Sequence, residues 1–155
     1  MAGASLQQSA QASLTRHGKS FAWAARFLPR AQADAAARLY AVCRSIDDLA
    51  DENPPDIARI ALSELRVALE AGDAHHPLVE RILELDASID LDRKALLDLI
   101  DGVEQDLTEV RITDEADLLR YAYRVAGTVG LMMCDVFDVK DRWARRHAID
   151  LGIAM

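Results

Sequence analysis

The chain has 155 residues, about half of them hydrophobic, which is enough for one domain with a buried core. Its formal net charge of -8 argues against general nucleic-acid binding, because neutralising a phosphate backbone needs clustered lysine and arginine. The sequence has neither a secretory signal pattern nor a run of about 18 apolar residues that could span a bilayer. We therefore expect a cytoplasmic protein with at most peripheral membrane contact.

Apolar residues recur at intervals of three and four rather than two, which predicts an all-α chain of six or seven helices. Residues 1–15 are predicted to be a flexible lead-in, and residues 16–155 a single domain. Prolines, glycines and capping residues divide this domain into predicted helices over residues 20–28, 31–51, 56–71, 77–85, 92–109, 113–136 and 141–155. Thr113 is the expected N-cap of the sixth helix. Cys43 and Cys134 lie in apolar stretches and are expected to be buried, reduced thiols.

The predicted helix 31–51 carries a distinctive set of polar residues towards its C-terminal end. Because an α-helix advances about 100° per residue, one side of this helix presents Tyr40, Arg44, Asp47 and Asp51. The opposite side presents residues suited to a core, namely Leu39, Val42, Ile46 and Leu49.

Two interpretations of this acidic set are open. In the first, Asp47, Asp48 and Asp51 form a solvated face, and Arg44 pairs with Asp47 or Asp48. In the second, the carboxylates bind a divalent cation. Like charges one turn apart repel each other, and the helix dipole disfavours negative charge at this end. Bound Mg²⁺ would remove both costs, and one or two carboxylates suffice when waters and substrate phosphates complete its coordination.

A second segment of interest runs from residue 17 to Pro29. Ser20 suits the start of a helix, either as a simple N-cap or, together with Lys19, as part of an anion site at the helix N-terminus. The apolar residues of the segment suit a core or a pocket wall: Phe21, Phe27 and Leu28.

The predicted helix 113–136 contains Gly127 and Gly130, each of which costs up to about 1 kcal/mol relative to alanine. The compensation is a kink, the close approach of a neighbouring helix, or space for a ligand. These glycines share a wall with Val125, Val129 and Met133. Such a wall either lines an apolar channel or packs tightly against a neighbouring helix.

Three segments resemble, in order, the signatures of the squalene and phytoene synthase family, the head-to-head isoprenyl diphosphate synthases. Residues 19–29 resemble its Ser-Phe…Leu-Pro box, and residues 40–51 resemble its first aspartate-rich motif. Two stretches resemble the mid-chain signature of the family: Gly102, Glu104, Asp106 and Leu107, and then Tyr121–Gly130. The sequence departs from the common pattern at Gly18 and at Arg111-Ile112, where serine and arginine-tyrosine occur in relatives.

The resemblance implies an isoprenoid-synthase-like helical array around a central cavity that holds two prenyl diphosphates. By position, Asp47 and Asp51 would bind Mg²⁺ carrying a diphosphate, and Arg44 would hold the departing diphosphate. Ser20 and Phe21 would close around that group.

The carbon chains would meet other residues of the resembled motifs. Tyr40 and Tyr121 would lie near the reacting carbons and help to stabilise carbocations. The prenyl tunnel would be lined by Val125, Ala126 and Val129.

The implied reaction joins two prenyl diphosphates head to head, with loss of diphosphate, in isoprenoid and carotenoid biosynthesis. Magnesium would neutralise the leaving group while an apolar cavity keeps water from an allylic cation. Phytoene synthase is the first expectation, and squalene or dehydrosqualene synthase the second.

The family pattern continues beyond the segment resembling Leu151–Met155 into a helix with a second aspartate-rich motif, which supplies the opposing magnesium ligands. The sequence does not contain that helix, so the resemblance implies an array that is incomplete at its C-terminal side. We therefore expect no synthase activity from the 155-residue chain alone. The alternative is a non-catalytic helical binding or assembly module with the same fold.

Overall fold

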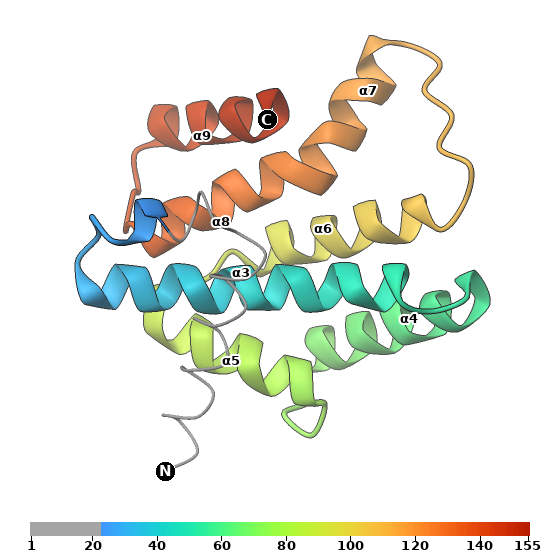
Figure 1. Cartoon of the computed structure of the whole chain (residues 1–155), viewed down its shortest axis with the longest axis horizontal. Coiled ribbons are helices and arrows are strands. Elements are labelled where there is room, and N and C mark those ends of the chain that lie inside the picture. The colour runs from blue at the N-terminus through green and yellow to red at the C-terminus, as the bar shows by residue number, and fades with distance from the viewer. Residues whose placement is uncertain (1–22) are drawn as a thin grey trace.

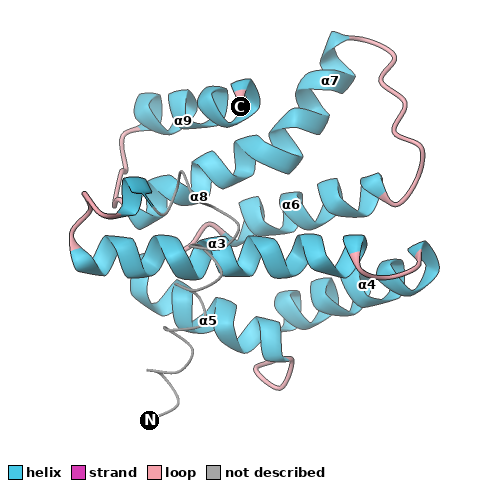
Figure 2. Cartoon of the chain, in the orientation of Figure 1, coloured by secondary structure: helices cyan, strands magenta, loops and turns pink. Residues whose placement is uncertain are grey.

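The computed structural model describes residues 23–155, and this part of the chain is helical without strands (Figures 1 and 2). The all-α prediction is therefore confirmed. The elements are α3 (Arg30–Asp51), α4 (Pro55–Ala71), α5 (Pro77–Ile89), α6 (Arg93–Asp106), α7 (Glu115–Ala122), the π-helical turn η1 (Tyr123–Gly127), α8 (Thr128–Val136) and α9 (Arg142–Ala154).

Most helix ends follow directly from local chemistry. Pro55 and Pro77 occupy the first turns of α4 and α5, where a missing N–H costs nothing. Gly72 ends α4 with a φ of 66°, a left-handed conformation that favours glycine. Asp92 accepts a hydrogen bond from the Ala95 N–H at 3.1 Å, and Asp141 caps α9 in the same way. These boundaries match the predicted ones closely because each depends on adjacent residues.

Helix α3 lies at the centre of the array, in contact with α4, α5, α6 and α8 (Figure 1). Its apolar side, with Leu39, Val42 and Ile46, is buried in a continuous core shared with α4, α5, α6 and α8. A fully buried leucine or isoleucine contributes roughly 1.5–3 kcal/mol relative to an exposed one, so this side fixes the orientation of the helix. The polar side of α3 is thereby turned towards α8.

The differences between predicted and observed ends of α5, α6 and α7 each have a local cause. Helix α5 continues to Ile89, four residues past the predicted end, because Ile89 packs against the core. Helix α6 stops at Asp106, because the Leu107 and Thr108 N–H groups bond to carbonyls three residues back and tighten the last turn. Thr113 was the predicted cap of the next helix. The structure instead places Asp114 there, accepting a hydrogen bond from the Asp117 N–H at 2.8 Å.

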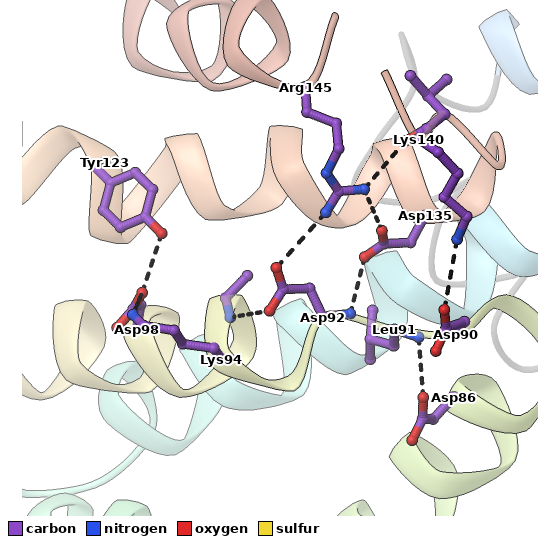
Figure 3. Close-up of polar contacts among 12 residues, drawn as sticks. Asp86, Asp90, Leu91, Asp92, Lys94, Asp98, Tyr123, Asp135, Lys140 and Arg145 are labelled. Atoms are coloured by element: carbon purple, nitrogen blue, oxygen red, sulfur yellow. Dashed lines mark hydrogen bonds and ion pairs between the residues drawn. The ribbon is translucent and has the colours of Figure 1, made fainter. Parts of the chain in front are cut away.

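The predicted helix 113–136 is interrupted by η1, a wide turn between α7 and α8. Figure 3 shows the Tyr123 hydroxyl of this turn donating to Asp98 on α6 at 3.1 Å. Periodicity did not indicate the turn, because a π-helical segment of five residues leaves the apolar pattern almost unchanged. Turns of this kind inside α-helices occur frequently at functional sites.

The glycines of this region allow α8 and α9 to approach each other closely. A Cβ atom on Gly130 would collide with the backbone carbonyl of Ala148, and one on Gly152 would lie 2.5 Å from the carbonyl oxygen of Ala126. Close helix approach, one of the compensations expected from the sequence, is therefore the reason for Gly130. Helix α9 is consequently held directly over the wall that carries Val129 and Met133.

Candidate active site

A cavity of about 460 Å³ lies between α3, α8 and the segment that precedes α3. Helix α3 contributes Tyr40, Arg44 and Asp47 to its lining, and α8 contributes Val129 and Met133. The remaining lining is apolar apart from one thiol: Ala24, Ala25, Leu28, Ala36, Leu39, Cys43 and Phe137. The cavity therefore combines a small charged region with a long hydrophobic wall.

Asp47 is the carboxylate that reaches this cavity. Burial raises the pKa of Asp47 to about 6, opposed by Arg44 and reinforced by the negative charges of Asp51, Asp48 and Asp106. Burial is the largest cause of the shift, and the carboxylates around Asp47 outnumber the one guanidinium that acts on it. An arrangement of this kind attracts a cation.

Arg44 pairs with Asp48, its neighbour one turn along α3. Arg44 Nη2 lies 2.6 Å from Asp48 Oδ1, although within residues 23–155 that buried oxygen accepts no hydrogen bond of good geometry. The sequence left the choice between Asp47 and Asp48 open, and the structure selects Asp48. Asp47 is therefore left on the cavity side, while Asp51, at the end of α3, is exposed to solvent.

Tyr121 lies on α7, outside the lining of the cavity. Partial burial raises the pKa of the Tyr121 hydroxyl, and a hydrogen bond with Asp106 at the end of α6 raises it further. Asp106 thus links two groups that the sequence named separately, because its charge also acts on Asp47. Its role was not predicted, although it belongs to the mid-chain motif.

A second groove, of about 410 Å³, runs between α8 and α9. It contains all three predicted tunnel residues, Val125, Ala126 and Val129, on one side. The side formed by α9 contains Ala148, Leu151, Gly152 and the terminal Met155. Three residues line both this groove and the first cavity: Val129, Met133 and Phe137. The two spaces therefore share one apolar wall along α8.

Two predicted site residues, Ser20 and Phe21, lie outside the described residues. Of the other apolar residues in that segment, Leu28 lines the cavity as expected. Phe27 does not, since its side chain is 73% exposed. The prediction of a core or wall position for Phe27 was wrong, because a short helical turn ended by Pro29 carries Leu28 inwards and Phe27 outwards.

Sequence reasoning missed Ala36 and Phe137 as lining residues. The signal for both was spacing, because Ala36 lies one turn before Tyr40, and Phe137 lies one turn after Met133. Cys43 was predicted only as a buried thiol. It is half-buried at the cavity, while Cys134 is buried, and both are free.

Two carboxylates of α3 have the oxygen chemistry that a magnesium ion prefers. Residues 23–155 contain no group of three or more histidine, cysteine, aspartate or glutamate side chains that could hold a metal by themselves. Asp47 and Asp51 offer two hard oxygen ligands one turn apart, with a local excess of negative charge. Magnesium commonly uses one or two carboxylates and takes its remaining ligands from water and substrate phosphates.

The fold and the site define a class of protein: a helical isoprenoid-synthase-like array with an aspartate-bearing helix beside an apolar cavity. A crystal structure of a dehydrosqualene synthase in complex with ligand superimposes with a TM-score of 0.80 at 25% identity. The match covers 97% of this chain and 53% of that one. A sequence model of the squalene/phytoene synthase family matches residues 14–155. The chain therefore belongs to the squalene/phytoene synthase family, as its motifs indicated.

Individual relatives point in the same direction. A phytoene synthase from Pseudescherichia vulneris is 34% identical over 149 residues, covering 88% of this chain and 48% of the relative. A presqualene diphosphate synthase from Rhodopseudomonas palustris is 36% identical over 143 residues, covering 89% of this chain and 51% of the relative. The chain thus spans about half the length of the curated relatives it matches.

Proposed function

We propose that the chain forms the diphosphate-binding part of a prenyltransferase that condenses two prenyl diphosphates head to head. The observation that carries the proposal is the placement of Tyr40, Arg44 and Asp47 along one side of a cavity whose opposite wall, with Val129 and Met133, is apolar. A prenyl diphosphate has the same division, because an anionic head is joined to a hydrocarbon chain. We propose phytoene synthase first and squalene or dehydrosqualene synthase second.

In this proposal the head of the substrate lies at α3. Asp47 and Asp51 hold the Mg²⁺, which when bound neutralises charge on the diphosphate. Arg44, already directed along the helix by Asp48, provides a fixed guanidinium for the departing diphosphate. Ser20 and Phe21 close around the same group.

The chain of the substrate lies along α8. Val125, Ala126 and Val129 form the tunnel wall, and the close approach of α9 excludes water from it. Tyr40 and Tyr121 stabilise positive charge on the reacting carbons, and Asp106 orients the Tyr121 hydroxyl. Exclusion of water matters because water would capture an allylic cation before carbon–carbon bond formation.

We propose a cytoplasmic enzyme of isoprenoid and carotenoid biosynthesis with peripheral membrane contact. No helix within residues 23–155 is both long and apolar enough to cross a bilayer. The curated relatives are about twice the length of this chain, and we propose that the activity needs a chain of that length.

Ligand binding by the 155-residue chain tests the site directly. Farnesyl thiodiphosphate, a non-reactive analogue, together with Mg²⁺ should raise the melting temperature by several degrees at saturating concentration. The increase should need both components and should disappear in Asp47→Asn, but persist in Glu84→Gln, which alters an exposed carboxylate on α5. An absent increase, or an equal one in EDTA, would contradict the proposal.

The reaction is tested with a complete synthase that contains this chain. Incubation with Mg²⁺ and geranylgeranyl diphosphate should yield phytoene, whereas a squalene-type product from farnesyl diphosphate would favour the second assignment. No hydrocarbon from either substrate would exclude both. Turnover by the 155-residue chain would contradict the proposal that the activity needs a longer chain.

A further inference from the structure

Both tryptophans of the chain lie at the surface. Trp23 is 63% exposed and Trp143 is 58% exposed. Trp23 stacks edge-on against Phe27, with ring centroids 5.0 Å apart, and Phe27 is itself exposed. Large aromatic side chains are usually mostly buried, so a surface that holds three of them requires an explanation.

The residues around these rings are basic, although the chain as a whole is acidic. Residues 23–30 contain Arg26 and Arg30 and no acid, and both arginines are exposed. Residues 142–147 contain three arginines and no acid, although Asp141 directly precedes them. Arg145 is paired with Asp135, which leaves Arg142 and Arg146 as the exposed positive charges. Arg142 and Arg146 flank Trp143, with guanidinium carbons 5.5 and 6.0 Å from the ring centroid. The net charge of the whole chain is -8, so this concentration of positive charge is a local feature.

The two basic segments lie at the same end of the molecule, and the first of them lines the cavity. Ala24, Ala25 and Leu28 of the first segment line that cavity together with Phe137, which immediately precedes the connection to α9. Figure 1 shows the segment before α3 and the start of α9 at the same end, whereas α7 lies at the other. We name the exposed residues at this end the arginine–aromatic surface: Trp23, Arg26, Phe27, Arg142, Trp143 and Arg146.

We propose that the arginine–aromatic surface binds the headgroup region of an anionic lipid membrane. Tryptophan rings are favoured at this depth because one part of the ring is apolar and the indole N–H is polar. Exposed arginines beside them are attracted to anionic headgroups. The charge of the surface thus complements that of the membrane, whereas the rest of the acidic chain is repelled from it.

The position of the surface suits the transfer of prenyl chains between membrane and cavity. This part of the proposal rests on the proposed prenyltransferase function. A prenyl chain that leaves the bilayer at this point meets the cavity wall at Leu28 and Phe137 without crossing bulk water. The hydrocarbon product returns by the same route. The membrane contact is therefore beside the apolar part of the cavity, not beside the carboxylates of α3.

Intrinsic fluorescence tests the proposal, because both tryptophans of the chain belong to the surface. Vesicles of phosphatidylcholine containing phosphatidylglycerol should shift the emission to shorter wavelength and co-sediment with the protein at low salt. High salt should weaken this binding. Vesicles of phosphatidylcholine alone should bind at least tenfold more weakly. Absence of a shift and of co-sedimentation, or equal binding to both vesicles, would overturn the proposal.

Charge variants locate the contact. The double variant Arg142→Gln/Arg146→Gln should bind anionic vesicles at least tenfold more weakly while keeping its melting temperature. The matched control, Arg111→Gln/Arg120→Gln, removes two exposed arginines from the other end of the molecule and should bind normally. Equal losses in both double variants would indicate non-specific attraction and contradict the assignment.

Two further measurements would recognise other occupants of this surface. Tighter binding to a DNA duplex than to anionic vesicles would assign the surface to nucleic acid. A dimer in solution with tryptophan emission already at short wavelength would assign it to a second copy of the chain. Either result would overturn the proposal. The Mg²⁺-dependent melting shift without vesicles is independent of membrane binding, so a failure of vesicle binding alone leaves the proposed prenyltransferase activity in place.

Discussion

Arg145 Nη1 on α9 lies 2.6 Å from Oδ1 of Asp135, a residue near the end of α8 that is 5% exposed (Figure 3). The second oxygen of Asp135 accepts the backbone N–H of Asp92 at 2.9 Å, immediately before α6. Arg145 also donates to the carbonyl of Val139 at 3.3 Å. One buried carboxylate thereby holds α6, α8 and α9 together at the end of the groove.

We expect Arg145→Met to lower the free energy of unfolding by about 2–4 kcal/mol, because it leaves the Asp135 charge buried without its partner. Urea unfolding followed by circular dichroism would measure the change. The control is Arg111→Met, which breaks the exposed ion pair with Glu109 and should change stability by less than about 0.5 kcal/mol. Equal effects of the two variants would show that the Asp135 pair contributes little.

We expect Gly130→Ala to destabilise the fold by about 2 kcal/mol or more, because the added methyl group would collide with the carbonyl of Ala148. Helix propensity alone predicts the opposite sign, a gain of up to about 1 kcal/mol. Thermal unfolding would distinguish the two.

Gly72→Ala provides the comparison for Gly130. Nothing lies within 4 Å of a Cβ at Gly72, but its φ of 66° disfavours alanine, so a loss of about 1 kcal/mol is expected. A smaller loss at Gly130 than at Gly72 would mean that α9 moves away at little cost.

Local features of the fold were predictable because their causes are adjacent in sequence. The bounds of α3, the stop at Gly72 and the cap at Asp141 each depend on residues within one or two turns. The Asp135–Arg145 pair was not predictable, since nothing near Asp135 distinguishes it from an exposed acid in an apolar helix. Only the tertiary packing of α6 and α9 buries it.

The candidate site also has features that the sequence predicts and features that it does not. Helical spacing placed Tyr40, Arg44 and Asp47 on one side of α3, and the structure has all three beside one cavity. Spacing could not decide whether Arg44 pairs with Asp47 or Asp48, because both lie within reach on the next turn. Nor could it reveal the effect of Asp106 on Asp47, which crosses between two helices.

The raised pKa of Asp47, about 6, makes stability depend on pH. Its ordinary value of 3.8 applies to the unfolded chain, so the native state holds the proton more tightly. Ionisation of Asp47 therefore destabilises the fold as pH rises from about 4 to about 6, and the penalty is complete above that range. Asp47→Asn should be more stable than the parent by about 1–2 kcal/mol at pH 7.5 in EDTA, allowing for screening by solvent.

The same variant should show no gain at pH 3.5, where Asp47 is protonated in both states. Urea unfolding at the two pH values measures both quantities. Glu84→Gln, at an exposed position on α5, should be neutral at both. A gain for Asp47→Asn that was equal at both pH values would arise from packing rather than from ionisation.

The reactivity of the Cys43 thiol, which lines the cavity, depends on the charge of Asp47. Burial, together with the negative charge of Asp47, raises the pKa of Cys43 to about 12. Because the thiolate is the reactive form, iodoacetamide at pH 8 should alkylate Cys43 in the native protein at least about a hundredfold more slowly than in urea. Asp47→Asn should accelerate the native reaction, whereas Glu84→Gln should not. Peptide mass spectrometry separates Cys43 from Cys134, whose pKa is raised by its own burial. An unchanged rate at Cys43 in Asp47→Asn would mean that the carboxylate is screened from the cavity, and would weaken its assignment as the ligand of a cation bound there.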